Sequence, residues 1–203
     1  MRALEDILCE SSSRHKHLCP RQVLGARMAL YAAEILALDL PRKDKRLLVT
    51  TEVDGCAVDG LIAATGCRAG SRTLRIVDFG KVAATFTDTC TDTSIRIVPA
   101  RDARTLAREF APHARNRWEA MLAGYQVMPF GRLFQTQPVR LNMTISEIIS
   151  KPGKQTFCNV CGEEVINGRE VMKNGRISCR ACAGEGYYQN IEPTCVVMQN
   201  VPS

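Results

Sequence analysis

The spacing of apolar residues divides the first part of the chain into helical and strand-like stretches. From Pro20 to about Leu38, apolar residues recur at intervals near 3.6, which predicts a helix with proline in its first turn. The sequence RLLVTTEV (46–53) is typical of a buried strand. DGCAVDGLIAATGC (54–67) then predicts a turn and a short helix that ends at Gly66, since glycine readily adopts the left-handed backbone of a helix C-terminus.

Alternating apolar and polar residues next predict three closely spaced strands, within 72–79, 81–88 and 93–100. Because so few residues separate them, we expect an antiparallel meander. Two helices, at about 101–111 and 114–126, and a strand within 137–143 complete the pattern. This order of helix, strand, helix and further strands predicts an α+β domain with a mixed sheet.

A change in composition separates this domain from a second, smaller part of the chain. TISEIISKPGKQT has proline and glycine together and no sustained apolar period, which predicts a linker over 144–156. We therefore expect an α+β metal-site domain at 1–143, a small zinc-ribbon-like module at 157–188 and a tail at 189–203. A length of 203 residues is sufficient for one full domain and such a module.

Four cysteines in the second part have the spacing of a metal site: Cys158, Cys161, Cys179 and Cys182. Two CxxC pairs supply four thiolates that can converge on the corners of a tetrahedron, the geometry that zinc prefers. Two disulfides are disfavoured in a reducing compartment, and iron held by four cysteines is less common than zinc. We expect a structural zinc, because a closed four-thiolate site leaves no position for a substrate.

A second group of candidate ligands lies in the first domain. HKHLCP contributes His17 and Cys19, DGCAVDG contributes Cys56, and TGC contributes Cys67. A histidine and two cysteines can hold zinc or iron with one position left for water or substrate. The alternative is that His17 and Cys19 only begin a helix or are partly buried. Cys19, Cys56 and Lys81 of DFGK are the candidate catalytic residues, although Lys81 also fits a solvated turn.

Charge and composition restrict the class of protein. Arginines recur at near-helical intervals in RDARTLAREFAPHARNRW (101–118), but a solvated helix face explains them better than nucleic acid does, given a net charge of only +6. No apolar run reaches the roughly 20 residues that a membrane span needs. The opening segment lacks the apolar core and cleavage site of a secretory signal, so we expect a cytoplasmic location.

Several motifs in order resemble one known family. HxCP, RMALYAAEILAL, TEVDGCAVDGLIAATGC, IVDFGKVAATF, CNVCGEE and CRAC are similar to the formylmethanofuran dehydrogenase E-subunit family, from about residue 15 to 188. The resemblance implies an N-terminal α+β domain, often dimeric, joined to a zinc-binding module. It also implies a metal at His17, Cys19 and Cys56, with Cys67 nearby.

The resemblance also guides the functional hypotheses. It implies a metal-binding accessory protein, a homodimer, that acts with or for a molybdenum or tungsten oxidoreductase. Lys16 replaces a common glycine and Arg68 follows TGC in place of threonine, which puts a cation near the predicted pocket and favours an anionic ligand. One alternative is therefore a metal- or thiol-dependent enzyme acting on a small anionic substrate. Another is a zinc-ribbon regulator that binds nucleic acid or protein, and the sequence leaves open whether the chain catalyses a reaction.

Overall fold

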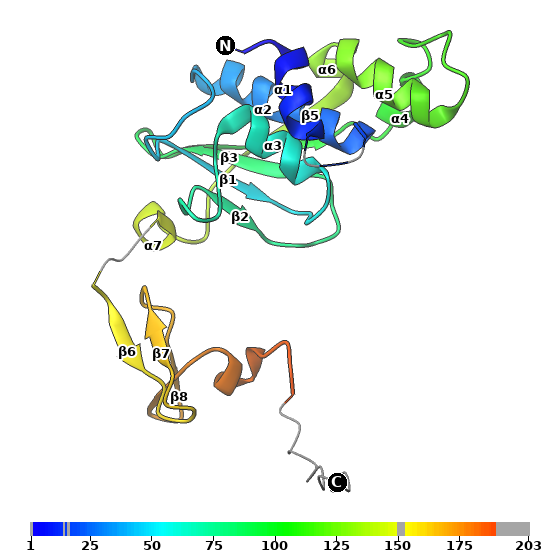
Figure 1. Cartoon of the computed structure of the whole chain (residues 1–203). Helices are drawn as coiled ribbons and strands as arrows, with labels where there is room; N and C mark the ends of the chain where they lie inside the picture. The colour runs from blue at the N-terminus through cyan, green and yellow to red at the C-terminus, as the bar shows by residue number, and fades with distance from the viewer. Residues whose placement is uncertain (1, 14, 16, 150–152, 190–203) are drawn as a thin grey trace, which may run out of the picture. The chain divides into compact units, whose positions relative to one another are not determined.

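The computed structural model divides into two compact units, residues 1–149 and 150–203 (Figure 1). The structure describes residues 2–13, 15, 17–149 and 153–189. Lys16 and most of the predicted tail therefore lie outside the described residues. Within those residues, no helix combines the length and the apolar composition needed to cross a bilayer.

The first unit contains seven helices and a five-stranded sheet in its described residues. The helices are α1 (Leu4–Ser12), α2 (Pro20–Leu36), α3 (Ala57–Thr65), α4 (Ala103–Leu106), α5 (Arg117–Val127), α6 (Phe130–Leu133) and α7 (Ile145–Ile149). The strands are β1 (Leu47–Thr51), β2 (Leu74–Ile76), β3 (Ala84–Asp88), β4 (Thr93–Pro99) and β5 (Phe134–Val139). This architecture confirms the predicted α+β class.

The sheet is mixed, with the strand order β2-β1-β3-β4-β5. β2 pairs in parallel with β1, and the remaining neighbours pair antiparallel. The prediction of a meander from β2 to β4 is therefore wrong in its first step, because β1 lies between β2 and β3. Alternation identifies a strand but not its neighbour. The helix α3 carries the chain from the end of β1 to a parallel β2, which a tight turn cannot do.

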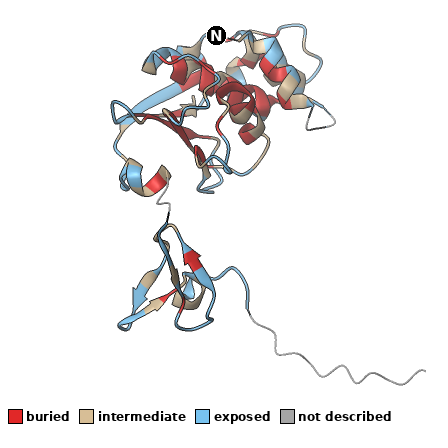
Figure 2. Ribbon diagram, turned by 60° about the vertical axis from the view of Figure 1, so that its left-hand side comes forward, coloured by how far each residue is buried: buried red, intermediate tan, exposed pale blue. Residues whose placement is uncertain are grey.

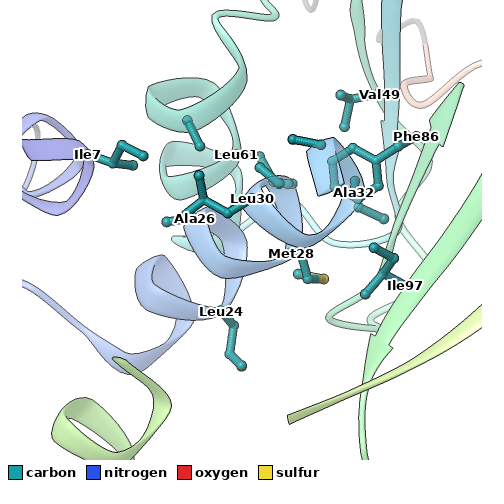
Figure 3. Packing of buried hydrophobic residues seen from close by; sticks show 14 of the residues in the cluster. Ile7, Leu24, Ala26, Met28, Leu30, Ala32, Val49, Leu61, Phe86 and Ile97 are labelled. Atoms are coloured by element: carbon teal, nitrogen blue, oxygen red, sulfur yellow. The ribbon is translucent and has the colours of Figure 1, made fainter. Parts of the chain in front are cut away.

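The core lies between the sheet and three stacked helices (Figure 2). Figure 3 shows α2 in the middle, with Ile7 of α1 and Leu61 of α3 on one side and Phe86 and Ile97 of the sheet on the other. Because neighbours cover α2 on opposite sides, eleven of its residues are buried, many more than a single apolar stripe would bury.

Two sets of helix boundaries differ from the sequence prediction. The helix α1 was not predicted, although Ile7, Leu8 and Ser11 form its buried face. The arginine-rich segment forms shorter helices than expected: α4 has only four residues, and α5 begins after Asn116. The Asn116 side chain accepts a hydrogen bond from the Glu119 amide at 2.9 Å, which fixes the start of α5.

The described residues of the second unit, 153–189, form two hairpins and one short helical segment. The hairpins pair β6 (Gln155–Phe157) with β7 (Glu164–Ile166) and β8 (Val171–Lys173) with β9 (Arg176–Ser178), and the segment η1 (Ala181–Glu185) follows. Asn174 and Gly175 connect β8 to β9 with φ values of 50° and 73°, the left-handed conformation that such two-residue turns need. The segment predicted as a linker contains α7 and the start of β6.

Candidate functional site

The four cysteines of the second unit converge on one point. Cys158 and Cys161 lie between β6 and β7, while Cys179 and Cys182 follow β9. Their sulfur atoms all lie within 4.8 Å of one another, and Cys161 Sγ is 3.9 Å from Cys179 Sγ. Zinc–sulfur bonds of about 2.3 Å in a tetrahedron place the sulfurs about 3.8 Å apart. The four side chains therefore fit a tetrahedral metal ion.

Backbone amides support the thiolate form at this cluster. The amide of Val160 donates to Cys158 Sγ at 3.4 Å, and the amide of Cys182 donates to Cys179 Sγ at 3.4 Å. Amide donors, chiefly that of Cys161, lower the pKa of Cys158 to about 6. The neighbouring thiol of Cys179, with burial, raises the pKa of Cys182 to about 12. Four thiolates so close together repel one another, and a bound cation is what would allow all four to ionise.

A second, smaller group of thiols forms where two helices begin in the first unit. Cys19 is the N-cap of α2, and Cys56 is the N-cap of α3. Both are half-buried and their side chains are neighbours. Burial, followed by the adjacent Cys19 thiol, raises the pKa of Cys56. The structure thus brings together two of the four residues predicted for this site.

Two glycines explain why these helix starts meet. A Cβ atom on Gly25 of α2 would lie 2.0 Å from the Ala57 carbonyl oxygen, and one on Gly60 of α3 would lie 2.1 Å from the Gln22 carbonyl oxygen. The backbones of α2 and α3 therefore touch near their N-termini, as only glycine permits. This contact places Cys19 beside Cys56. Each of these helices has a glycine inside its helical pattern, and this is the sequence signal that could have predicted the close contact.

A buried glutamine fixes the first turn of α2. The Gln22 side chain is fully buried; its Oε1 accepts from the Cys19 amide at 2.8 Å, and its Nε2 donates to the Ser11 carbonyl at 3.1 Å. It therefore joins the end of α1 to the residue that carries the first thiol. Sequence reasoning did not single out Gln22, since a lone glutamine has no distinctive spacing.

Both thiols line a cleft of about 620 Å³. The cleft lies at the end of the sheet where β1 and β4 finish and β3 begins. Loops from these three adjacent strands meet there. Three arginines and two aromatic residues contribute to its walls: Arg21, Arg101, Arg104, Trp118 and Tyr125. None of the described residues that line it is acidic. The sequence pattern assigned Arg101 and Arg104 to a solvated face, and both are exposed, but it could not place α4 and α5 beside the thiols.

The other predicted site residues lie at different places. His17 is exposed, and its ring packs at a tilt against Trp118, with centroids 6.4 Å apart. A metal site of the predicted kind needs at least three histidine, cysteine or acidic side chains with their ligand atoms close together. Within the described residues, only the four cysteines of the second unit form such a group. His17 therefore does not complete one with Cys19 and Cys56. His15 instead contacts Asp59, with Nε2 2.7 Å from Oδ2.

Cys67 and Lys81 do not join the thiol pair. Cys67 lies beyond the opposite end of α3 from Cys56; it is buried, and its sulfur is 3.4 Å from the Leu47 carbonyl oxygen. Burial raises the pKa of Cys67. Lys81 is exposed with its amino group 5.9 Å from the centre of the Phe79 ring, and the adjacent Val82 lines the cleft in its place.

The chain resembles known proteins in sequence and in structure. One curated relative, a probable S-adenosyl-L-methionine-binding protein of Archaeoglobus fulgidus, is 34% identical over 85 residues, which are 40% of this chain and 23% of that protein. The chain therefore spans about a quarter of that relative.

The crystal structure of an FmdE-like protein from Syntrophus aciditrophicus, named after a tungsten formylmethanofuran dehydrogenase, has the same fold. The TM-score is 0.59 with 18% sequence identity, over 93% of this chain and 96% of the other. The family described as "FmdE, Molybdenum formylmethanofuran dehydrogenase operon" matches residues 14–135, which include both Cys19 and Cys56. Since this match covers more than half of the sequence, the protein belongs to the FmdE family.

Proposed function

We propose that this protein is a metal-binding accessory protein of the FmdE family, with zinc held by Cys158, Cys161, Cys179 and Cys182. The observation that carries the proposal is the convergence of four sulfur atoms within 4.8 Å. Thiolate ligands in tetrahedral arrangement favour zinc over the harder divalent ions. Zinc in a closed site of this kind supplies folding stability and leaves no position for a substrate.

The composition of the second unit supports a structural role for the metal. Phe157 and Met172 are 61% and 68% exposed, and Val165 is one of the few buried apolar residues between 153 and 189. Two short hairpins with so small a core are marginal in water on their own. Metal binding would therefore provide most of the free energy that orders this unit.

Metal analysis of the purified protein tests the four-cysteine proposal. A Cys158→Ser, Cys161→Ser variant removes one CxxC pair, and a Cys9→Ser, Cys90→Ser variant removes two exposed cysteines as a matched control. We expect the first variant to lose one zinc equivalent per chain and the control to retain it. Equal zinc content in both variants would contradict the proposal.

We further propose a second metal, zinc or iron, at His17, Cys19 and Cys56. Its support is the neighbouring pair of thiols, with His17 two residues before Cys19. The His17 ring packs on Trp118 and would have to turn toward the thiols to become the third ligand. A Cys19→Ser, Cys56→Ser variant should lower the metal content from two equivalents to one. One equivalent in the wild type, unchanged by these substitutions, would remove the second metal and leave the first intact.

The proposed partner follows from the family. Its description refers to a molybdenum formylmethanofuran dehydrogenase operon, which supports an association with a molybdenum or tungsten oxidoreductase, and the resemblance supports a homodimer. Light scattering on the purified protein tests the dimer, and binding to the purified oxidoreductase tests the association. The binding of S-adenosyl-L-methionine that the relative's name states supports no proposal for this chain, because the match spans only 23% of that relative.

A further inference from the structure

The cleft beside Cys19 and Cys56 carries positive charge that the described part of the chain does not neutralise. Arg21, Arg101 and Arg104 line it, and within the described residues none of them has a carboxylate within 4.0 Å. By contrast, Arg46 and Arg96 each form an ion pair, at 3.0 and 2.6 Å. Because the described lining has no acidic residue, the electrostatic potential of the cleft favours an anion.

The same cleft also offers a flat apolar wall. Trp118 is 43% exposed, although it lies on a helix that packs against α2. Met121 and Tyr125 follow it on the same side of α5, and the Tyr125 hydroxyl lies beside Arg104. An aromatic ring placed on this wall would bury apolar surface while an attached anionic group reached the arginines.

The size of the cleft matches a small organic molecule. Its volume of about 620 Å³ falls within the range of about 300 to 1,000 Å³ that small-molecule sites occupy. The positions of the arginines also suit ligand binding. Arg101 and Arg104 lie in the loop and short helix that follow β4, at the end of the sheet where the loops of three strands meet. Both residues are exposed, so an anion can reach them from solvent.

We propose that this cleft binds a small organic anion with a flat aromatic ring, stacked on Trp118 and held at its phosphate or carboxylate by Arg101 and Arg104. The proposal goes beyond metal binding and does not require a metal at the two thiols. The phosphate and carboxylate versions share one chemistry, and the probes below distinguish them.

Trp118 is the single tryptophan of the chain, so its fluorescence reports directly on the cleft. The probes are two matched pairs: AMP with adenosine, and 4-biphenylcarboxylate with 4-biphenylcarboxamide. In each pair the ring is kept and the charge is removed. We expect at least one anion to quench Trp118 and to bind about tenfold or more tightly than its neutral analogue, as charged hydrogen bonds imply. Calorimetry provides the same constants without the fluorophore.

An Arg101→Gln, Arg104→Gln variant should weaken binding of that anion about tenfold or more, and high salt should weaken binding in the wild type. Arg108→Gln, an exposed arginine of the same segment that does not line the cleft, is the matched control and should bind as the wild type does. Circular dichroism checks that each variant is folded, and a single Arg101→Gln variant replaces the double one if it is not.

Three results would overturn the proposal. The first is equal affinity for the anions and their neutral analogues, or no binding of either anion at millimolar concentration. The second is unchanged binding in the arginine variants. The third is inorganic phosphate binding as tightly as AMP, in the absence of carboxylate binding, because the ring would then contribute nothing.

Discussion

Replacing Gly60 by alanine would place a Cβ atom 2.1 Å from the carbonyl oxygen of Gln22 and 2.8 Å from the amide nitrogen of Ala26. Both atoms belong to the backbone of α2, so no side chain can rotate away. An ordinary contact for a Cβ atom begins near 3.4 Å, and α2 and α3 would therefore have to separate by about 1.3 Å. The helices that carry Cys19 and Cys56 would move apart at the point where their N-termini meet.

The expected loss of stability follows from two opposing effects. Overpacking of a close interface costs about 1 to 3 kcal/mol, and a backbone contact belongs at the upper end of that range because it relaxes least. Alanine is a better helix former than glycine by about 1 kcal/mol, which offsets part of the loss. The net destabilisation should be about 1 to 2 kcal/mol, or a decrease in Tm of about 2 to 8 °C for a domain of this size.

Thermal and urea unfolding followed by circular dichroism measure this change. Gly131→Ala is the matched control, since it also substitutes a helical glycine but its Cβ would meet nothing within 4 Å. The control should be as stable as the wild type or slightly more stable. Gly25→Ala strains the same interface, so the Gly25→Ala, Gly60→Ala double variant should lose less stability than the two single losses combined. If Gly60→Ala proves as stable as Gly131→Ala, the two helices do not cross at these glycines.

Three further predictions concern other parts of the molecule. Glu52 is buried and pairs with Arg96 at 2.6 and 2.8 Å, and this arginine lowers the pKa of the Glu52 carboxyl. The ion pair's stabilising contribution is therefore complete above the pKa of about 4.3 that Glu52 has in the unfolded chain, and it is lost as the pH falls through the lower folded pKa. Urea titrations from pH 7 to pH 3 should show a smaller acid-dependent loss of stability for Glu52→Gln than for the wild type. Gln22→Leu leaves the Cys19 amide and the Ser11 carbonyl without their partner and should cost about 1 to 3 kcal/mol in urea unfolding; unchanged stability would mean that water replaces both bonds. Chelation of zinc should expose residues 157–188 to proteolysis without changing the Tm of the first unit, which has its own core; loss of both units together would contradict this.

The sequence was most informative where a local pattern determines local structure. The spacing of the four cysteines predicted the cluster in which Cys161 and Cys179 lie 3.9 Å apart, and Gly66 predicted the end of α3. The order of strands in the sheet depends on pairing between distant residues, which alternation cannot specify. The meander was wrong for this reason, because β1 occupies the place beside β3 that β2 was expected to fill.

The candidate site of the first unit shows the same limit. Cys19 and Cys56 could be grouped from their positions at the starts of two predicted helices. Cys67 was added through the TGC motif and the family resemblance, but a nine-residue helix, about 13 Å long, lies between it and Cys56. The arginines of 101–118 were predicted to form a solvated helix face, and their place at the cleft could not be predicted because it depends on how α4 and α5 pack after β4.

The two proposals for the first unit share one cleft but depend on different atoms, which makes them separable by experiment. A metal would be held by sulfur atoms at the starts of α2 and α3, whereas an organic anion would be held by guanidinium groups from the segment after β4 and by the face of Trp118. A Cys19→Ser, Cys56→Ser variant should therefore lose the second metal and keep its affinity for the anion within about twofold. An Arg101→Gln, Arg104→Gln variant should keep the second metal and bind the anion more weakly. If the thiol variant also loses the anion, and a chelator has the same effect on the wild type, the anion is a ligand of the metal. In that case the arginines only orient it, and the cleft is one site with two components.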